Sequence, residues 1–274
     1  MAEQAKPQSA AQREVARNIA IHDKVAGQYE KLHGEIFNTI EQSRLRASLQ
    51  SALDSVETGR TPPHAFDFGC GSGNLTAHLL ALGAKVTAAD VSRGFLDLVS
   101  KRFGGELLQT FQLNGRDLSE IADGSFDLVA TYSVLHHIPD YLDACRELAR
   151  ITAPGGVVVI DHEASPASWT DPILAEFRSN GMRTDWRKFL TPMNYVHRLK
   201  RVFNPKHSNE GDIHVWPDDH IEWNKIAETM GGGGMSVIRE EDYLLSRSLQ
   251  RLDAYEQYRD RCNDTRVTVY RKQR

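Results

Sequence analysis

The segment Asp67-Phe68-Gly69-Cys70-Gly71-Ser72-Gly73-Asn74 follows a short strand pattern at 64–68 and leads into a helical pattern at 74–82. Glycines at alternate positions let the backbone turn tightly and come close to a ligand. A helix that begins behind them offers unpaired N–H groups to a carboxylate or a phosphate. The spacing G-x-G-x-G places Asn74 where the dinucleotide fingerprint G-x-G-x-x-G has its third glycine. We therefore predict a ligand-binding turn between a strand and a helix.

Two carboxylates accompany this turn. Asp67 precedes the glycines, where its side chain can accept hydrogen bonds from an ammonium group. Asp90 closes the next strand pattern, at 85–92, where an acidic side chain can accept from both hydroxyls of a ribose. The pair makes this turn a sharper ligand-binding signal than a glycine-rich loop alone.

Strand and helix patterns alternate around the turn. We expect strands at 64–68, 85–92, 107–113, 125–135 and 156–161, with helices at 74–82, 95–103 and 141–152 between them. This alternation is typical of a parallel sheet with helices on both faces. A helix at 218–230, for which Asp219 and Glu222 resemble a capping box, and strands at 235–244 and 266–272 complete the pattern.

The two flanking regions differ from this core. Residues 14–55 contain no proline and carry apolar residues at helical spacing, which predicts one or two helices, broken near Gly27 or Gly34. A linker with two prolines follows at 58–64. We assign residues 1–60 to an N-terminal helical lid and residues 61–274 to the main domain, with an inserted substrate cap at 164–217.

Residues 65–161 resemble the core of the class I S-adenosylmethionine-dependent methyltransferases, in the small-molecule branch. DFGCGSGN is similar to the first motif of that family, and AADVS is similar to its ribose-binding acidic turn. GSFDLVATYSVLHHI and APGGVVVI are similar to the motifs of its fourth and fifth strands. The resemblance implies an α/β, Rossmann-like, doubly wound seven-stranded sheet with a reversed last strand. It also implies S-adenosyl-L-methionine as cofactor and methyl transfer to O, N or C of a small organic acceptor.

The same resemblance implies which residues bind the cofactor. The backbone at 69–73 would hold the methionine portion near Asp67, Asp90 would bind the ribose, and Val91 would pack beside the adenine. Asn114 stands where many relatives place an Asp that contacts the adenine amine, with Asp117 as an alternative. The implied set is Asp67, Gly69, Cys70, Gly71, Gly73, Asn74, Asp90, Val91, Asn114, Gly115, Tyr132 and Ser133, of which Tyr132 and Ser133 would border the transferred methyl group.

Methyl transfer from a sulfonium requires alignment, exclusion of water and a free lone pair on the acceptor. A hydroxyl acceptor benefits from a general base, for which histidine is the usual choice, whereas an amine needs none. His136 and His137 follow the fourth strand, and His162 follows the fifth, at the edge where open α/β sheets bind ligands. We take His137 and His162 as base candidates and His136 as a substrate contact. The alternative for His136 and His137 is a role in turns and helix caps, and for His162 it is the ordinary polarity of a loop.

Tyr29 and His33 lie four residues apart on one face of the leading helix pattern. They are either substrate contacts or residues that pack the lid. Residues 207–220 hold several His, Asp and Glu, but they lack a tight ligand spacing such as H-E-x-x-H, so we expect no metal.

Composition excludes several other classes. The 274 residues include 33 Lys or Arg and 37 Asp or Glu, and the pI of 6.3 argues against general nucleic-acid binding. No apolar run of ~18 residues predicts a transmembrane segment, and the first residues do not form a secretory signal. Three widely spaced cysteines, Cys70, Cys145 and Cys262, favour a cytoplasmic setting.

Residues 178–207 carry eight Lys or Arg against one Asp, interleaved with aromatic residues. Such a segment recruits an anionic acceptor, lies on a lipid surface, or forms a solvated cap whose aromatic residues pack on the sheet. Two alternative functions stay open at this point. One is methylation of a lipid or quinone precursor at the membrane face, and the other is a non-catalytic cofactor-binding protein. A nicotinamide-dependent oxidoreductase is disfavoured by Asn74.

Overall fold

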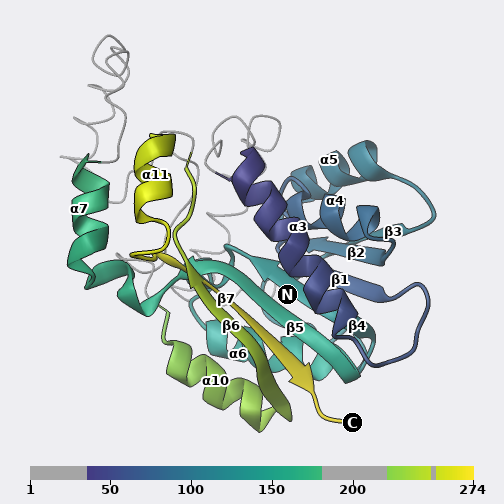
Figure 1. The fold of residues 1–274 in the computed structure, drawn as a ribbon. Coiled ribbons are helices and arrows are strands. Elements are labelled where there is room, and N and C mark those ends of the chain that lie inside the picture. Colours follow the sequence, from purple (N-terminus) through teal and green to yellow (C-terminus); the bar gives the residue numbers. More distant parts are fainter. Residues whose placement is uncertain (1–35, 181–220, 248–250) are drawn as a thin grey trace, which may run out of the picture.

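A seven-stranded sheet organises the computed structural model, which describes residues 36–180, 221–247 and 251–274 (Figure 1). The strand order is β3-β2-β1-β4-β5-β7-β6. β1 to β5 run parallel, whereas β7 is antiparallel to both β5 and β6. The expected doubly wound sheet with one reversed strand is therefore confirmed. The strands are β1 His64–Phe68, β2 Lys85–Asp90, β3 Leu108–Gln112, β4 Phe126–Tyr132, β5 Thr152–Ala164, β6 Met235–Tyr243 and β7 Thr265–Lys272.

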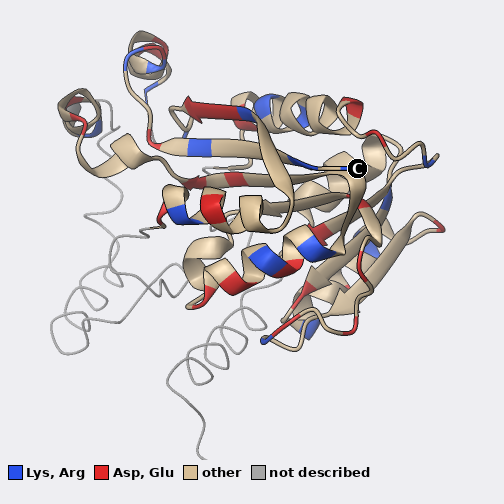
Figure 2. Cartoon of the chain, turned by 90° about the horizontal axis from the view of Figure 1, so that it is seen from below, with Lys and Arg blue, Asp and Glu red and all other residues tan. Residues whose placement is uncertain are grey.

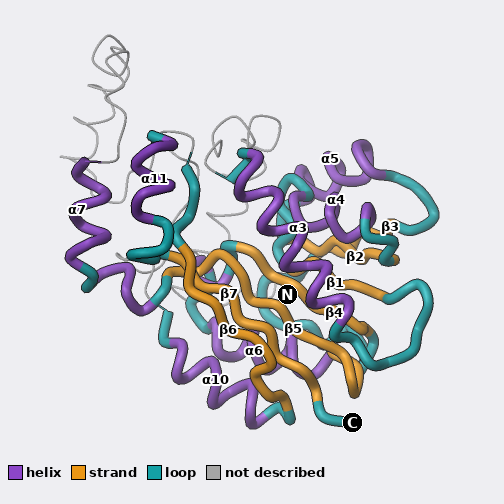
Figure 3. Tube along the Cα trace, in the orientation of Figure 1, coloured by secondary structure: helices purple, strands orange, loops and turns teal. Residues whose placement is uncertain are grey.

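Helices cover both faces of the sheet (Figure 3). α3 (Thr39–Asp54), α4 (Asn74–Ala81) and α5 (Arg93–Phe103) pack on one face, and α6 (Tyr141–Ile151) and α10 (Trp223–Gly232) pack on the other. α7 (Pro172–Asn180) follows β5, and α11 (Leu252–Tyr258) connects β6 to β7. Figure 2 shows Lys and Arg interspersed with Asp and Glu along the helices.

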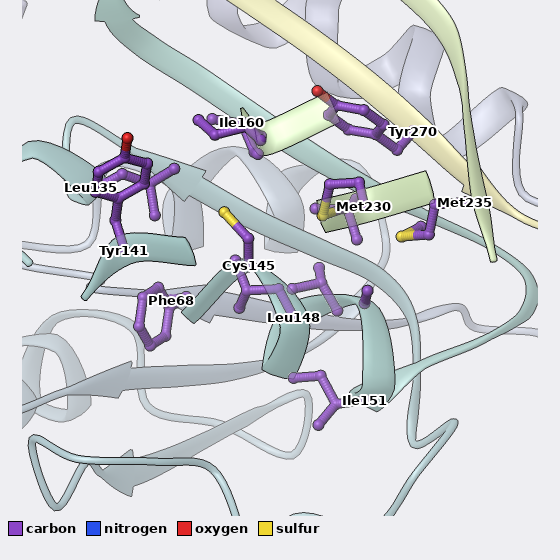
Figure 4. Close-up of a cluster of buried hydrophobic side chains, with 14 of the residues drawn as sticks. Phe68, Leu135, Tyr141, Cys145, Leu148, Ile151, Ile160, Met230, Met235 and Tyr270 are labelled. Atoms are coloured by element: carbon purple, nitrogen blue, oxygen red, sulfur yellow. The ribbon is translucent and has the colours of Figure 1, made fainter. Parts of the chain in front are cut away.

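Each face of the sheet has its own apolar core. Leu135, Tyr141, Cys145 and Met230 meet the sheet residue Ile160 on the α6 side (Figure 4). Leu45 and Leu49 of α3 pack on the opposite face against Val157 and Val159 of β5. All four of these α3 and β5 side chains are at most 1% exposed, and full burial of such a side chain stabilises the fold by roughly 1.5–3 kcal/mol. The two cores leave the carboxyl ends of the strands as the edge where polar residues gather.

Some element boundaries differ from the sequence-based expectation. β4 ends at Tyr132 rather than at residue 135, because Ser133 adopts a left-handed conformation, with φ of 60°, that turns the chain out of the strand. α10 begins at Trp223 with Glu222 at its N-cap, so the helix starts later than predicted; Asp219 lies outside the described residues. α11 was not expected, since its seven residues are too few to give a helical pattern in the sequence.

The lid and cap are described only in part. α3 lies within the predicted lid, but residues 1–35, including Tyr29 and His33, lie outside the described part of the chain. Of the predicted cap at 164–217, the structure describes a 3-10 turn at Pro166–Trp169 and α7. The domain assignment therefore stays a prediction.

Candidate functional site

The glycine turn between β1 and α4 has the left-handed backbone that glycine permits. Gly69, Gly71 and Gly73 have φ values of 74°, 49° and 91°, a region that side chains with a Cβ rarely adopt. A Cβ on Gly69 would lie 2.6 Å from the Val134 side chain, and one on Gly73 would lie 2.7 Å from Phe103. A Cβ on Gly71 would have no atom of residues 36–180, 221–247 or 251–274 within 4 Å. The turn is therefore packed at both ends and open in its middle, where a ligand can approach the backbone.

Asp90 holds this turn against β2. One carboxylate oxygen accepts the N–H of Gly71 at 2.9 Å, and the other accepts the N–H of Ser92 at 2.8 Å. The side chain is 5% exposed, and each carboxylate oxygen can accept more than one hydrogen bond. Asp90, which is predicted to bind the ribose, thus lies beside the open part of the turn. Val91 directly follows Asp90 in the chain.

Asp67 is buried beneath the turn with one oxygen left for a ligand. Its Oδ2 accepts the hydroxyl of Thr76 at 2.6 Å, whereas its Oδ1 has no hydrogen-bond partner in the described part of the chain. Burial raises the pKa of Asp67 to about 7. An ammonium group at Oδ1 would satisfy this oxygen and favour the ionised carboxylate. The unpartnered carboxylate oxygen of Asp67 therefore fits the ammonium group of the predicted cofactor.

Two predicted cofactor residues direct their side chains elsewhere. The Asn74 side-chain oxygen accepts from Gln42 of α3 at 3.0 Å, so this amide joins α4 to α3. The Asn114 oxygen accepts the N–H groups of Arg116 and Asp117 at 2.7 and 3.0 Å, and its amide nitrogen donates to Asp117 at 3.0 Å. The adenine contact of Asn114 and Gly115 stays a prediction.

The turn after β4 brings His136 to a buried carboxylate. His136 Nδ1 lies 2.7 Å from Glu163 Oε2, and the other oxygen of Glu163 accepts the N–H groups of Val134 and Leu135 at 2.9 and 2.7 Å. The ring of His137 lies 4.0 Å from that of His136. His136 and Glu163 are 7% and 1% exposed. The two side chains are 27 residues apart in the chain, and only the pairing of β4 with β5 brings them together.

His162 occupies a different position. Its φ is 61°, and its ring packs against Tyr132, with 4.5 Å between the ring centroids. The three histidines predicted at this edge are therefore all present there, but in two groups: His136 with His137, and His162 with Tyr132.

Sequence reasoning missed a buried ionic network below this edge. Arg44 of α3 donates to Glu41 in the same helix and to Asp161 at the end of β5. The hydroxyl of Tyr132 donates to Glu41 at 2.9 Å, and that of Tyr243 donates to Asp161 at 2.9 Å. Burial raises the pKa of Glu41 despite the neighbouring guanidinium. Glu41 and Arg44 have the spacing of an ordinary exposed helical pair, so the sequence gave no signal that they would be buried.

The described ranges contain neither a metal-binding cluster nor a membrane-spanning helix. No group of three or more His, Cys, Asp and Glu side chains there could hold a metal ion, and residues 207–220 lie outside these ranges. None of the helices described is both long and apolar enough to cross a bilayer.

Residues 66–160 match the family model described as a methyltransferase domain. The ubiquinone biosynthesis O-methyltransferase of Cereibacter sphaeroides is 31% identical over 216 residues, which cover 68% of this chain and 86% of the relative. The protein of the same description from Caulobacter is 28% identical, over 61% of this chain and 69% of the relative. Two further relatives of this description match over 54% and 96% of their own length.

A solved structure supports the same fold. The 1,6-didemethyltoxoflavin-N1-methyltransferase of Burkholderia thailandensis, with its substrate and S-adenosylhomocysteine bound, superposes with a TM-score of 0.56 at 16% identity. The match covers 100% of this chain and 95% of the other. At this level of identity the likeness concerns the fold alone.

Proposed function

The chain belongs to the class I S-adenosylmethionine-dependent methyltransferases, in the branch that acts on small molecules, and on this basis we propose its acceptor. We propose that the protein methylates a hydroxyl oxygen of a small, uncharged phenol or catechol. The observation that carries the choice of oxygen is the recurrence of O-methyltransferases among the relatives. Their printed names concern ubiquinone biosynthesis, and quinones arise from phenolic and hydroquinone precursors. We therefore propose a phenolic ring as the acceptor class.

The residues around the glycine turn fit the cofactor. S-adenosyl-L-methionine supplies, when bound, an electrophilic methyl group on a positively charged sulfur. The backbone at 69–73 would hold its methionine portion, with Asp67 Oδ1 toward the ammonium group and Asp90 on the ribose. Val91 would lie beside the adenine, and Tyr132 and Ser133 would border the methyl group. The orphaned Oδ1 of Asp67 and the open side of Gly71 support this placement.

The charge of the site favours a neutral acceptor. Five carboxylates at this edge are at most 5% exposed, and Arg44 is bonded to two of them; they are Glu41, Asp67, Asp90, Asp161 and Glu163. Buried carboxylates that are short of cationic partners favour a cationic cofactor and disfavour an anion near the reacting atoms. An acidic group on the acceptor would have to be bound by the basic segment at 178–207, of which residues 181–207 lie outside the described part of the chain.

The proposal is tested with the purified protein, S-adenosyl-L-methionine and a panel of acceptors. The panel pairs catechol and hydroquinone with the matching aromatic amines and with a benzoate. Mass spectrometry of the products gives the gain of one methyl group, and fragmentation gives the atom that carries it. We expect O-methyl products from the uncharged phenols. Methylation of the amines alone would contradict the choice of oxygen. Cofactor binding in calorimetry without any turnover would instead favour a non-catalytic binding protein.

A further inference from the structure

Two buried polar atoms on either side of the glycine turn have no hydrogen-bond partner among the described residues. One is an acceptor, Oδ1 of Asp67, which precedes the turn, and the other is a donor, Nδ2 of Asn74, which follows it. A buried donor or acceptor that stays unpaired is costly, so such atoms in a native fold call for an explanation. An acceptor and a donor that flank one turn match the ammonium and the carboxylate of an amino acid.

The orientation of the Asn74 amide is set by Gln42 of α3. Gln42 Nε2 lies 3.0 Å from Asn74 Oδ1 and 2.9 Å from the carbonyl oxygen of Ile36. A carbonyl oxygen only accepts hydrogen bonds, so the contact with Ile36 identifies the NH2 end of Gln42. This NH2 group requires the oxygen of Asn74 as its second acceptor, and Nδ2 of Asn74 therefore faces away from Gln42.

His78, one turn after Asn74 on α4, binds the other end of the Gln42 amide. Its Nε2 lies 2.9 Å from Gln42 Oε1, which can only accept, so Nε2 carries the ring proton. Gln42 thus has three partners, and at each contact a donor meets an acceptor. Reversal of either amide would place two donors or two acceptors against each other.

We propose that Gln42 is a positioning residue for the cofactor, which holds the Asn74 amide so that Nδ2 donates to the carboxylate of the methionine portion. This inference rests on the proposed placement of that portion over the glycine turn, and it does not depend on the acceptor. No motif in the sequence includes Gln42, and 32 residues separate it from Asn74. Only the packing of α3 on α4 brings the two amides together.

The contact with the carboxylate is tested with two ligands that differ in that group alone. Decarboxylated S-adenosylmethionine keeps the ammonium group, the sulfonium and the nucleoside of S-adenosyl-L-methionine. Gln42→Met keeps the length of the side chain but can no longer orient Asn74. In isothermal titration calorimetry we expect the Kd for S-adenosyl-L-methionine to rise about 3- to 10-fold, as for the loss of one hydrogen bond. The Kd for the decarboxylated ligand should change by less than about twofold, because that ligand has no carboxylate to bind.

Asn74→Ala and the double variant show whether Gln42 acts through Asn74. Asn74→Ala removes the donor itself, so it should weaken S-adenosyl-L-methionine binding at least as much as Gln42→Met. The double variant should then bind no more weakly than Asn74→Ala alone, because residues that act through one contact are not additive. Gln50→Met is the matched control and should leave both Kd values unchanged, since Gln50 is exposed on the same helix and donates to Asp54 at 2.8 Å.

Nitrogen-15 NMR of the ligand-free, histidine-labelled chain tests the orientation of the amides directly. Burial lowers the pKa of His78 below its ordinary value of 6.5, so the ring is neutral at pH 8. The resonances of His78 are identified by their loss in His78→Phe. We expect the proton of the neutral ring on Nε2. A proton on Nδ1 would mean that the Gln42 and Asn74 amides are reversed, and it would overturn the inference.

The binding data separate this inference from a structural role and from the placement on which it rests. Equal weakening of both ligands in Gln42→Met would show that Gln42 only holds α3 against α4, and an unchanged Kd for S-adenosyl-L-methionine would show that Gln42 does not serve the cofactor. Either result overturns the inference. If the placement itself is wrong, Gly71→Ala, at the open part of the turn, also binds S-adenosyl-L-methionine as the wild type does.

Discussion

Arg44, in the second turn of α3, and Asp161, at the end of β5, form an ion pair in which Nη2 lies 3.1 Å from Oδ2. The guanidinium also binds Glu41 and lies over the ring of Tyr243, 3.9 Å from its centroid. Through these contacts the Arg44 guanidinium joins α3 to residues near the ends of β5 and β6. These contacts lie on the face of the sheet that α3, part of the predicted lid, covers.

Replacement of this cation is expected to destabilise the protein. Arg44→Met keeps a long apolar side chain but leaves Glu41 and Asp161 buried without their positive partner. Breaking a buried pair in this way costs roughly 3–5 kcal/mol. Urea unfolding measures the change, and Arg46→Met, on an exposed position of the same helix, is the control. Equal stability of the two variants would mean that desolvation of the Arg44 pair cancels its attraction.

The sequence predicted the parts of this protein that depend on local pattern. The glycine turn, the strands around it and the polar ends of those strands follow from residues next to one another in the chain. The Arg44–Asp161 pair joins residues 117 positions apart, and no local pattern indicates it. Asn114 shows that a match to a motif does not fix a side chain's contacts. Its position corresponds to a family motif, but its side-chain oxygen accepts the N–H groups of Arg116 and Asp117 in the same turn.

Ionisation of Asp67 is expected to make stability depend on pH in the ligand-free protein. Burial raises the pKa of Asp67 from 3.8 to about 7, so between these values the folded state holds a proton that the unfolded state has lost. Stability from this group is therefore complete below about pH 4 and is lost as the pH rises toward 7. At about 1.36 kcal/mol for each pKa unit, the loss is of the order of 4 kcal/mol. Asp67→Asn removes the titrating group, so unfolding free energies measured from pH 4 to 8 should fall less steeply than in the wild type. Parallel curves for the two proteins would show that Asp67 ionises normally.

Loss of the Asp90 carboxylate is expected to weaken cofactor binding. If Asp90 binds the ribose as proposed, Asp90→Ala would remove two charge-assisted hydrogen bonds worth ~1–3 kcal/mol together, so the Kd for S-adenosyl-L-methionine should rise roughly 5- to 150-fold. Isothermal titration calorimetry gives the Kd, and Asp97→Asn on the exposed side of α5 serves as control. A melting curve is needed beside it, because Asp90 also accepts the N–H groups of Gly71 and Ser92. Unchanged affinity would show that the ribose is bound elsewhere.

Gly69 and Gly71 should respond differently to the same substitution. Both have positive φ, so Gly→Ala at either position strains the backbone by roughly 1–2 kcal/mol. At Gly69 the added methyl group also lies 2.6 Å from Val134, whose branched side chain has little rotameric freedom, so Gly69→Ala should be the less stable variant.

At Gly71 the methyl group meets no atom of the described residues and enters the open side of the turn. Gly71→Ala should therefore lose affinity for S-adenosyl-L-methionine while it loses less stability than Gly69→Ala. Calorimetry and urea unfolding of both variants separate these effects, and Val134→Ala combined with Gly69→Ala should recover part of the lost stability because it removes the clash. If Gly71→Ala binds the cofactor as the wild type does, the ligand does not approach the backbone at this residue, and the placement of the methionine portion over the turn is wrong.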